Sequence, residues 1–325
     1  MRAILTAAPG GWKSTSLTEV PEPVAGPGDV LVEIKAIGLN PADYFQIEGS
    51  YPGGPRAPFI CGRDAAGVVI QGDAVGRWRP GSSVVVLQTE DRSLAEGTFC
   101  ERQKFPAHSL APLPTGWSYE EGAAAPLAYQ TAWRGLVIQG GLSEGKTVVI
   151  TGASGGVGSA GVLLAAGLGA RVVALSRSPE KQARLKEIGA HFVFSPEDKD
   201  LKKKIFAALD TKGVDLVLEN VGGPSLGTSV HLLGIKGKVC VVGLLAGVEG
   251  SIPIPSLMFK QASVEGVVVS AYSAEESQDS WTQIVETLAK VGRKPILEGS
   301  FPMTDYLAAF ERLRSAPFGK VVLAT

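Results

Sequence analysis

Cysteine is scarce in this sequence, with only three residues among 325. They stand at positions 61, 100 and 240, so they form neither a CxxC pair nor an even set that would indicate a disulfide framework. Such sparse, unpaired cysteines are typical of a reducing compartment, and we expect a cytoplasmic protein.

An excess of charge of one sign is also absent. The chain has 31 basic and 32 acidic residues, a net charge of −1, which gives no long-range attraction to nucleic acid or to an anionic membrane. Neither partner is predicted. One stretch without charged residues, Thr147–Ala170, is long enough to span a bilayer, but its seven glycines favour short elements joined by turns. The short apolar start, Met1–Thr6, predicts a first strand and no export signal.

What this uncharged stretch contains is the most informative pattern in the chain. A β-branched run ends in a glycine-rich turn, a helix is expected over Val162–Leu168, and a second strand over Arg171–Leu175. Small residues in such a turn let backbone N–H groups and a helix N-terminus approach a diphosphate. The alternative is a turn that serves packing alone. We predict a dinucleotide pyrophosphate site made by Ala153, Ser154, Gly155, Gly156, Val157 and Gly158.

The end of the second strand indicates which dinucleotide binds. An NAD site normally offers Asp or Glu to the ribose 2′-OH at this place, but the chain has no carboxylate in Leu175–Ser178. Ser176 can donate a hydrogen bond, and Arg177 and Lys181 can pair with a 2′-phosphate. This pattern favours NADPH over NADH. The alternative is that both cations are solvated charges at the start of a helix over Pro179–Ile188.

Alternating strands and helices organise the second half of the chain. This alternation predicts a doubly wound parallel sheet of the Rossmann type, an α/β fold. The remainder consists of short strands separated by Pro and Gly turns, and the terminal strand Lys320–Leu323 is expected to return to that first domain. We therefore predict a β-rich catalytic domain, 1–118 plus 291–325, with a dinucleotide-binding domain, 119–290, inserted in it. The parallel strands are expected near Val148, Val172, Val193, Leu216, Val241 and Val267.

Several motifs together carry a family resemblance over essentially the whole chain: Gly38–Asp43, Gly62–Val69, Pro80–Val84, the glycine turn, Asn220–Gly223 and Gly319–Leu323. The chain resembles the medium-chain dehydrogenases/reductases, specifically the zinc-free, zeta-crystallin-like quinone oxidoreductase branch. This resemblance implies that the β-rich domain is GroES-like. It also implies further cofactor contacts, at Thr131, Asn220, Gly243 and Leu244, and a place for Asn40 near the nicotinamide ribose. Pro196 departs from the tyrosine that many relatives place against the 2′-phosphate.

No metal is expected. Zinc-dependent members of the family carry a Cys three residues before an Asp, and then a Gly-His-Glu, as zinc ligands. Here Asn40 precedes Asp43, and Gly62 is followed by Arg63 and Asp64. Asn is a poor zinc ligand and Arg remains protonated, so the positions do not suit zinc. Without a Lewis acid, we expect hydride transfer to an already electrophilic quinone or conjugated carbonyl.

The resemblance also suggests a catalytic hydroxyl. Tyr51 stands where related enoyl-thioester and quinone reductases carry a tyrosine that faces the nicotinamide, and Tyr44 is the nearby alternative. We expect Tyr51 to stabilise the enolate that forms during hydride transfer. Tyr51 could instead be a loop residue without a catalytic role, and Asn40 a turn residue before Pro41.

Other functions are weighed against this NADPH-dependent quinone or 2-alkenal-type reductase. The same residues would serve an enoyl-thioester reductase or a zinc-independent alcohol or aldehyde oxidoreductase, and a non-enzymatic NADPH-binding structural or RNA-binding protein is a further alternative. The short-chain reductases require Tyr-xxx-Lys, which no tyrosine here satisfies. The apolar run Val264–Val269 would be an exposed edge strand in a monomer, so we expect a homodimer.

Overall fold

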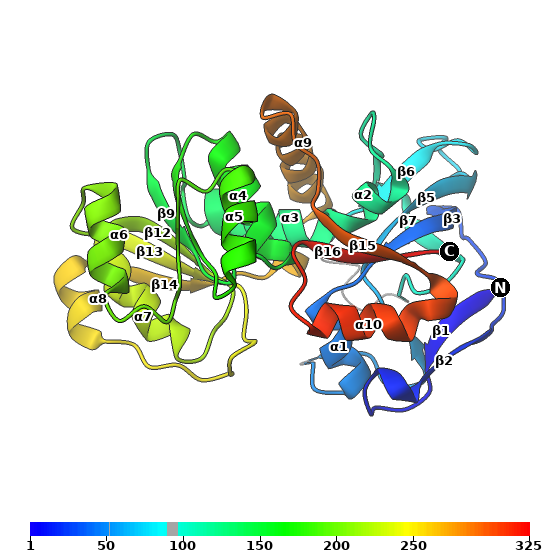
Figure 1. Ribbon diagram of the computed structural model, residues 1–325. Helices are drawn as coiled ribbons and strands as arrows, with labels where there is room; N and C mark the ends of the chain where they lie inside the picture. Colours follow the sequence, from blue (N-terminus) through cyan, green and yellow to red (C-terminus); the bar gives the residue numbers. More distant parts are fainter. Residues whose placement is uncertain (52, 90–96) are drawn as a thin grey trace. The chain divides into compact units, whose positions relative to one another are not determined.

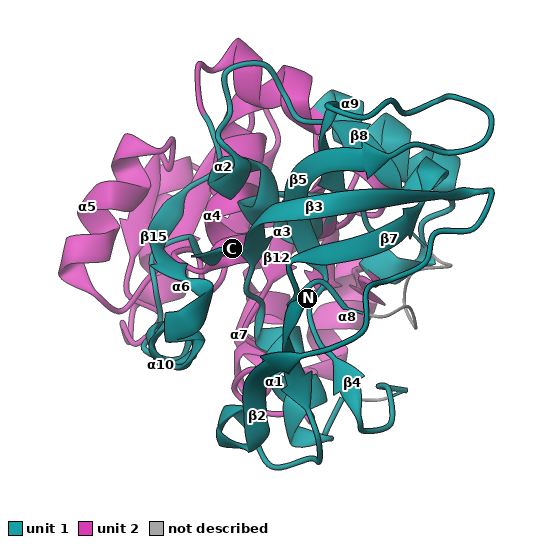
Figure 2. Cartoon of the chain, turned by 90° about the vertical axis from the view of Figure 1, so that its right-hand side faces the viewer, with its two compact units in different colours: residues 1–130, 269–283, 294–325 teal, residues 131–268, 284–293 magenta. Residues whose placement is uncertain are grey.

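The computed structural model describes residues 1–51, 53–89 and 97–325 (Figure 1). The chain divides into two compact units (Figure 2). Unit 1 contains residues 1–130, 269–283 and 294–325, and unit 2 contains residues 131–268 and 284–293. Unit 1 is thus discontinuous in sequence. The domain limits expected from the sequence divide the chain at 118 rather than 130, and they stay a prediction.

Unit 2 is built on a six-stranded parallel sheet in the order β11-β10-β9-β12-β13-β14. β9 is buried along its whole length, as its β-branched sequence favours. The strands are β9 (Thr147–Ile150), β10 (Arg171–Leu175), β11 (Phe192–Phe194), β12 (Val214–Glu219), β13 (Leu233–Val241) and β14 (Ser263–Gly266).

Helices follow these strands in the alternation that the sequence predicts. Ser178 caps α5 by accepting from the backbone N–H of Lys181, and Pro179 occupies the first helical turn, where its missing N–H costs nothing. Val149, Val173, Ile205 and Val217 belong to one apolar core of this unit. The helices are α4 (Gly156–Gly167), α5 (Pro179–Glu187), α6 (Leu201–Leu209), α7 (Ser225–Leu232) and α8 (Ile254–Lys260).

Unit 1 contains a seven-stranded sheet and a three-stranded sheet. The larger has the order β15-β16-β3-β5-β6-β8, with β7 also paired to β3, and the smaller has the order β2-β1-β4. Its strands are β1 (Arg2–Thr6), β2 (Thr15–Glu19), β3 (Asp29–Gly38), β4 (Phe59–Ile60), β5 (Asp64–Gln71), β6 (Ser83–Val86), β7 (Arg102–Pro106), β8 (Leu110–Pro112), β15 (Leu297–Pro302) and β16 (Lys320–Ala324).

The C-terminal strand joins the N-terminal part of the chain, as predicted. β16 runs antiparallel to β3, with Val322 opposite Gly38, so that residues near the two ends of the sequence share one sheet. Unit 1 also contains α1 (Pro41–Glu48), α2 (Tyr119–Ala124) and α10 (Tyr306–Arg314). The helices α3 (Pro126–Trp133) and α9 (Ala274–Lys290) contribute residues to both units.

The α/β class and the parallel sheet are confirmed, and one element is shorter than expected. The strand predicted over Val264–Val269 ends at Gly266, and a 3₁₀ turn follows at Val269–Ala271. Within the described part of the chain, no helix combines the length and the apolar character needed to cross a bilayer.

Candidate functional site

The glycine turn between β9 and α4 has the geometry of an anion cradle. Gly152 adopts the left-handed conformation, with φ +54°, and Gly155 is the N-cap of α4. A Cβ at Gly158 would lie 2.3 Å from the Gly152 carbonyl oxygen, so only glycine allows the helix to start this close to the turn. The helix has no side-chain cap and no acidic residue in its first turn. Its N-terminal N–H groups can therefore donate hydrogen bonds to an anionic ligand.

The predicted 2′-phosphate residues lie next to this turn. The backbone N–H of Ala153 donates to the Leu175 carbonyl at 3.2 Å, which joins the turn to the end of β10. Ser176 is buried immediately after β10, and its N–H donates to the Phe194 carbonyl at 3.0 Å. Arg177 is exposed to solvent, and Lys181 is half-buried in the first turn of α5. Unit 2 thus brings Ser176, Arg177 and Lys181 to the same edge of the sheet as the turn.

Asn220 stands at the same edge, after the neighbouring strand β12. Its Nδ2 donates to the Thr151 carbonyl at 2.9 Å, and its backbone N–H donates to Thr151 Oγ1 at 2.8 Å. The loop after β13 packs closely against the Asn220 backbone, because a Cβ at Gly243 would lie 2.0 Å from the Asn220 carbonyl oxygen. Leu244 is exposed, and Thr131 is buried in α3. The carboxyl ends of β9, β12 and β13 therefore converge on Asn220, as expected for ligand binding in such sheets.

Asn40 belongs to a buried cluster of charged groups in unit 1. Its Oδ1 accepts from Lys320 Nζ at 2.5 Å, and its Nδ2 donates to Asp64 Oδ2 at 2.9 Å. Lys320 Nζ lies 3.2 Å from the same Asp64 oxygen, and the other Asp64 oxygen accepts from the Leu127 N–H at 2.8 Å. All three side chains are at least 95% buried. Both ends of the Asn40 amide are thus occupied by partners inside the protein.

These residues do not fit a zinc ion. The positions that hold zinc ligands in metal-dependent members of the resembled family carry an amide at Asn40 and a guanidinium at Arg63. The Lys320 ammonium lies within hydrogen-bonding distance of the amide, and a cation there opposes binding of a second cation. Among the described residues, no group of three or more His, Cys, Asp or Glu side chains is arranged to hold a metal.

Tyr51 lies beside Arg63. The Arg63 guanidinium carbon is 4.8 Å from the centroid of the Tyr51 ring, a cation–π contact, and Arg63 Nε is 4.0 Å from Asp43 Oδ1. Burial raises the pKa of the Asp43 carboxyl to about 7, against the lowering effect of the nearby Arg63 and Lys320 charges. The alternative, Tyr44, donates its hydroxyl hydrogen bond to Glu48, which raises its own pKa.

Sequence reasoning missed two charged residues in these places. The sequence patterns assign no role to Lys320, which lies in the terminal strand and in a family motif, or to Glu219, which accepts the Thr151 hydroxyl hydrogen bond at 2.9 Å. Lys320 begins the otherwise apolar run Lys320–Leu323, and Glu219 ends β12, where it follows the apolar residues Leu216–Leu218. A charge in that position is buried in the sheet and must find a partner, which is the signal that would have identified both.

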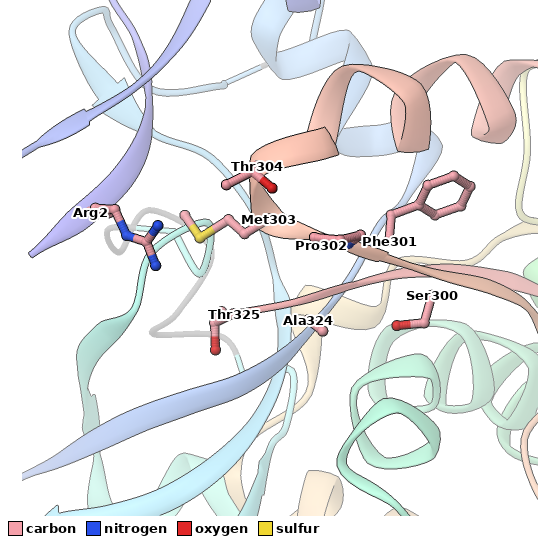
Figure 3. A pocket seen from close by; sticks show the side chains of 8 residues that line it. All are labelled: Arg2, Ser300, Phe301, Pro302, Met303, Thr304, Ala324 and Thr325. Carbon is pink, nitrogen blue, oxygen red and sulfur yellow. The ribbon is translucent and has the colours of Figure 1, made fainter.

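A separate cavity of about 430 Å³ lies in unit 1 (Figure 3). None of the predicted site residues lines it, and its one charged side chain, Arg2, is paired with Glu101 at 2.7 Å. The lining residues are Arg2, Ser300, Phe301, Pro302, Met303, Thr304, Ala324 and Thr325.

Comparison with known proteins places the chain in one family over nearly its whole length. The model of the alcohol dehydrogenase GroES-like domain matches residues 26–131, and that of the zinc-binding dehydrogenases matches residues 156–290. A quinone oxidoreductase from Lama guanicoe is 30% identical over 99% of this chain and 97% of its own length. The structure of Escherichia coli quinone oxidoreductase complexed with NADPH is similar to this chain over 100% of both chains, with a TM-score of 0.90 and 25% identity. A mycobacterial protein complexed with NADPH gives the same values.

Proposed function

Since the chain belongs to the medium-chain dehydrogenase/reductase family, in its quinone oxidoreductase branch, and is an oxidoreductase, we propose that it transfers hydride from NADPH to a quinone or an α,β-unsaturated carbonyl without a metal ion. The observation that carries this proposal is the glycine turn that opens onto the uncapped N-terminus of α4. Relatives that resemble this chain over their full length bind NADPH, which supports the choice of cofactor.

Unit 2 holds the cofactor in this proposal. The amides of Ala153, Ser154, Gly155, Gly156, Val157 and Gly158 bind the pyrophosphate, and the helix dipole of α4 favours its charge. Ser176, Arg177 and Lys181 bind the 2′-phosphate, each charged contact contributing about 1.5–3 kcal/mol. Thr131 lies near the nicotinamide, and Asn220, Gly243 and Leu244 are further contacts to the cofactor.

The chemistry requires a donor for the substrate oxygen. When bound, NADPH supplies the hydride. The Tyr51 hydroxyl donates a hydrogen bond to the carbonyl oxygen of the acceptor and so stabilises the enolate, to which it can also deliver its proton. The Arg63 guanidinium packs over the Tyr51 ring and so positions that side chain. Asn40 completes the site as a fixed amide near the ribose, held by Lys320 and Asp64.

The proposed absence of a catalytic metal follows from the donor set. Asn40 and Arg63 stand at two zinc-ligand positions of the metal-dependent relatives, and the neighbouring Asp64 carboxylate is already paired with the Lys320 ammonium. An acceptor that is electrophilic by conjugation can take a hydride without a Lewis acid, whereas an isolated carbonyl is less suited. This reasoning favours quinones and 2-alkenals over simple ketones.

We also propose a homodimer in the cytoplasm. β14 is an edge strand of the six-stranded sheet, and nearby Ile254, Met258, Phe259 and Val268 are large apolar residues that are at least 58% exposed. Pairing β14 with a second copy would cover this edge. The three cysteines are buried thiols rather than disulfides, which fits a reducing compartment. Light scattering after size-exclusion chromatography tests the dimer, and fractionation tests the location.

The test of the function is steady-state oxidation of NADPH and NADH with a quinone, a 2-alkenal and an enoyl thioester, using protein dialysed against a chelator. We expect NADPH to be preferred, turnover with the quinone or the alkenal, and no change when zinc is added. Activity that requires zinc would contradict the metal-free mechanism. Turnover with the thioester alone would support an enoyl-thioester reductase. Tight NADPH binding without turnover would support a binding role, which filter binding to RNA at physiological salt would examine.

A further inference from the structure

A fully buried carboxylate, Glu219, lies at the carboxyl end of β12. One of its oxygens accepts from the Thr151 hydroxyl at 2.9 Å, from the Val221 N–H at 2.9 Å and from the Gly222 N–H at 3.0 Å. The other oxygen accepts from the Ser225 hydroxyl at 2.9 Å and from the Ser229 hydroxyl. With five donors and no neighbouring cation in these bonds, Glu219 ties the end of β9, the loop after β12 and helix α7 to one point.

The bond to Thr151 continues to Asn220. The Thr151 hydroxyl has a single proton, which it gives to Glu219, and its oxygen accepts from the Asn220 N–H at 2.8 Å. Asn220 Nδ2 in turn donates to the Thr151 carbonyl at 2.9 Å. Because a carbonyl can only accept, this bond fixes which end of the amide is nitrogen. The Asn220 side chain therefore has one orientation.

This orientation leaves one polar atom without a partner. Asn220 is 92% buried, since its exposed fraction is 8%, and its Oδ1 has no hydrogen-bond partner within the described residues. A buried amide oxygen without a partner is costly in a folded protein, and a ligand that brings a donor to this position would remove that cost. It lies at the strand ends where the pyrophosphate turn begins.

We propose that Glu219 is a positioning residue of the dinucleotide site: acting through Thr151, it holds Asn220 so that its amide oxygen accepts a hydrogen bond from an O–H or N–H group of the bound dinucleotide. This inference rests on the proposed function, because it requires that a dinucleotide binds at the turn. Glu219 itself does not touch the cofactor. Its effect is on affinity, through the orientation of Asn220.

The structure provides a matched control at the opposite end of the same two strands. Thr147 Oγ1 donates to Asp215 Oδ2 at 2.6 Å, and the Asp215 N–H donates to Thr147 Oγ1 at 3.0 Å. This pair repeats the chemistry of Thr151 with Glu219 and Asn220, but it lies at the amino ends of β9 and β12. Replacing either threonine by valine removes the same kind of hydroxyl bond.

The experiment measures the NADPH Kd by fluorescence titration, and the melting temperature, for the wild type and for Thr151→Val, Thr151→Ser and Thr147→Val. We expect Thr151→Val to raise the Kd about tenfold, the loss of roughly one buried hydrogen bond to the cofactor. Thr151→Ser keeps the hydroxyl and should stay within about threefold. Thr147→Val should lower the melting temperature comparably while leaving the Kd within about twofold.

A double-mutant cycle then tests whether the effect passes through Asn220. If it does, Thr151→Val combined with Asn220→Ala binds NADPH no more weakly than Asn220→Ala alone. The NADPH Kd of Glu219→Gln, compared with that of Asp215→Asn, tests the carboxylate directly. If Glu219→Gln does not fold, the Kd of Thr151→Val decides whether Glu219 positions Asn220. Equal Kd values for Thr151→Val and Thr147→Val would overturn the positioning role of Glu219. The proposed function would still stand in that case, provided that the wild type binds NADPH. A wild type that does not bind NADPH would overturn both.

Discussion

Lys320 Nζ lies 2.5 Å from Asn40 Oδ1, although 280 positions separate the two residues in the sequence. The contact exists because β16 pairs with β3, which brings the last strand of the chain next to the residues that precede α1. Lys320 is also 3.2 Å from Asp64, so one buried ammonium both neutralises a buried carboxylate and fixes the Asn40 amide. The same cluster therefore stabilises unit 1 and fixes the orientation of Asn40, a proposed site residue.

Removal of Lys320 should destabilise the protein strongly. Lys320→Met leaves the buried Asp64 carboxylate without its counter-charge, a change that costs about 3–5 kcal/mol for a buried pair. The free energy of unfolding in urea measures this cost. Adding Asp64→Asn to Lys320→Met removes the unpaired charge and should restore part of the loss. A single variant that loses less than about 1 kcal/mol would show that Asn40 and Leu127 satisfy Asp64 without the lysine.

Asp43 should make stability depend on pH. Its folded pKa is raised from 3.8 to about 7, chiefly by burial, so the folded state binds a proton more tightly than the unfolded state. The slope of the unfolding free energy with pH is then negative, and the contribution of Asp43 is largest below about pH 4 and is lost as pH rises toward 7. Asp43→Asn removes this contribution to the slope.

The measurement compares urea unfolding of the wild type and Asp43→Asn at several values between pH 5 and 8. The difference between the two proteins isolates Asp43 from the other titrating groups. Asp279→Asn, an exposed aspartate on α9, is the control and should follow the wild type. A wild type and an Asp43→Asn variant with parallel pH profiles would contradict the assignment of the raised pKa.

The sequence predicts the parallel sheet well because its signals are local. The β-branched run Thr147–Ile150 ends at a glycine-rich turn, and the capping Ser178 with Pro179 marks the start of α5. The end of β14 was placed three residues too late, at Val269, since an apolar run does not reveal where a backbone turns into a 3₁₀ helix. Local patterns thus give the elements and their order, with less accurate ends.

The polar clusters could not be predicted in the same way, because they depend on register. Which residue lies opposite Asn40 follows from the pairing of β16 with β3, and which hydroxyl meets Glu219 follows from the pairing of β9 with β12. A shift of one residue in either pairing would point the side chain to the other face of the sheet. The turn residues 153–158, being contiguous, needed no such information.

The choice between NADPH and NADH should depend on the end of β10. Arg177→Ala removes one charged contact to the 2′-phosphate, and we expect a Kd for NADPH about tenfold higher or more, since such a contact contributes about 1.5–3 kcal/mol. The Kd for NADH, which lacks that phosphate, should change less than about twofold. Lys181→Ala should act in the same direction, and Lys186→Ala, at an exposed position later in α5, is the control. Equal effects of Arg177→Ala on both nucleotides would assign Arg177 to general electrostatic attraction.

Tyr51→Phe tests the proposed proton donor. The substitution keeps the ring that contacts Arg63 and removes only the hydroxyl, so the cation–π contact and the fold should persist. If the hydroxyl stabilises the enolate, kcat with a 2-alkenal should fall by roughly 10²-fold or more, while the Kd for NADPH stays unchanged.

Tyr44→Phe provides the comparison within the same segment. The Tyr44 hydroxyl donates to Glu48, so its loss should lower stability slightly and leave kcat within about twofold. A large fall in kcat for Tyr44→Phe, with none for Tyr51→Phe, would transfer the catalytic role to Tyr44. If neither variant loses activity, the proton comes from water, and the enolate is stabilised by other donors. A quinone acceptor gives a further comparison, because the anion formed on its oxygen is more stable than an enolate. The kcat with a quinone should therefore depend less on the tyrosine than the kcat with a 2-alkenal.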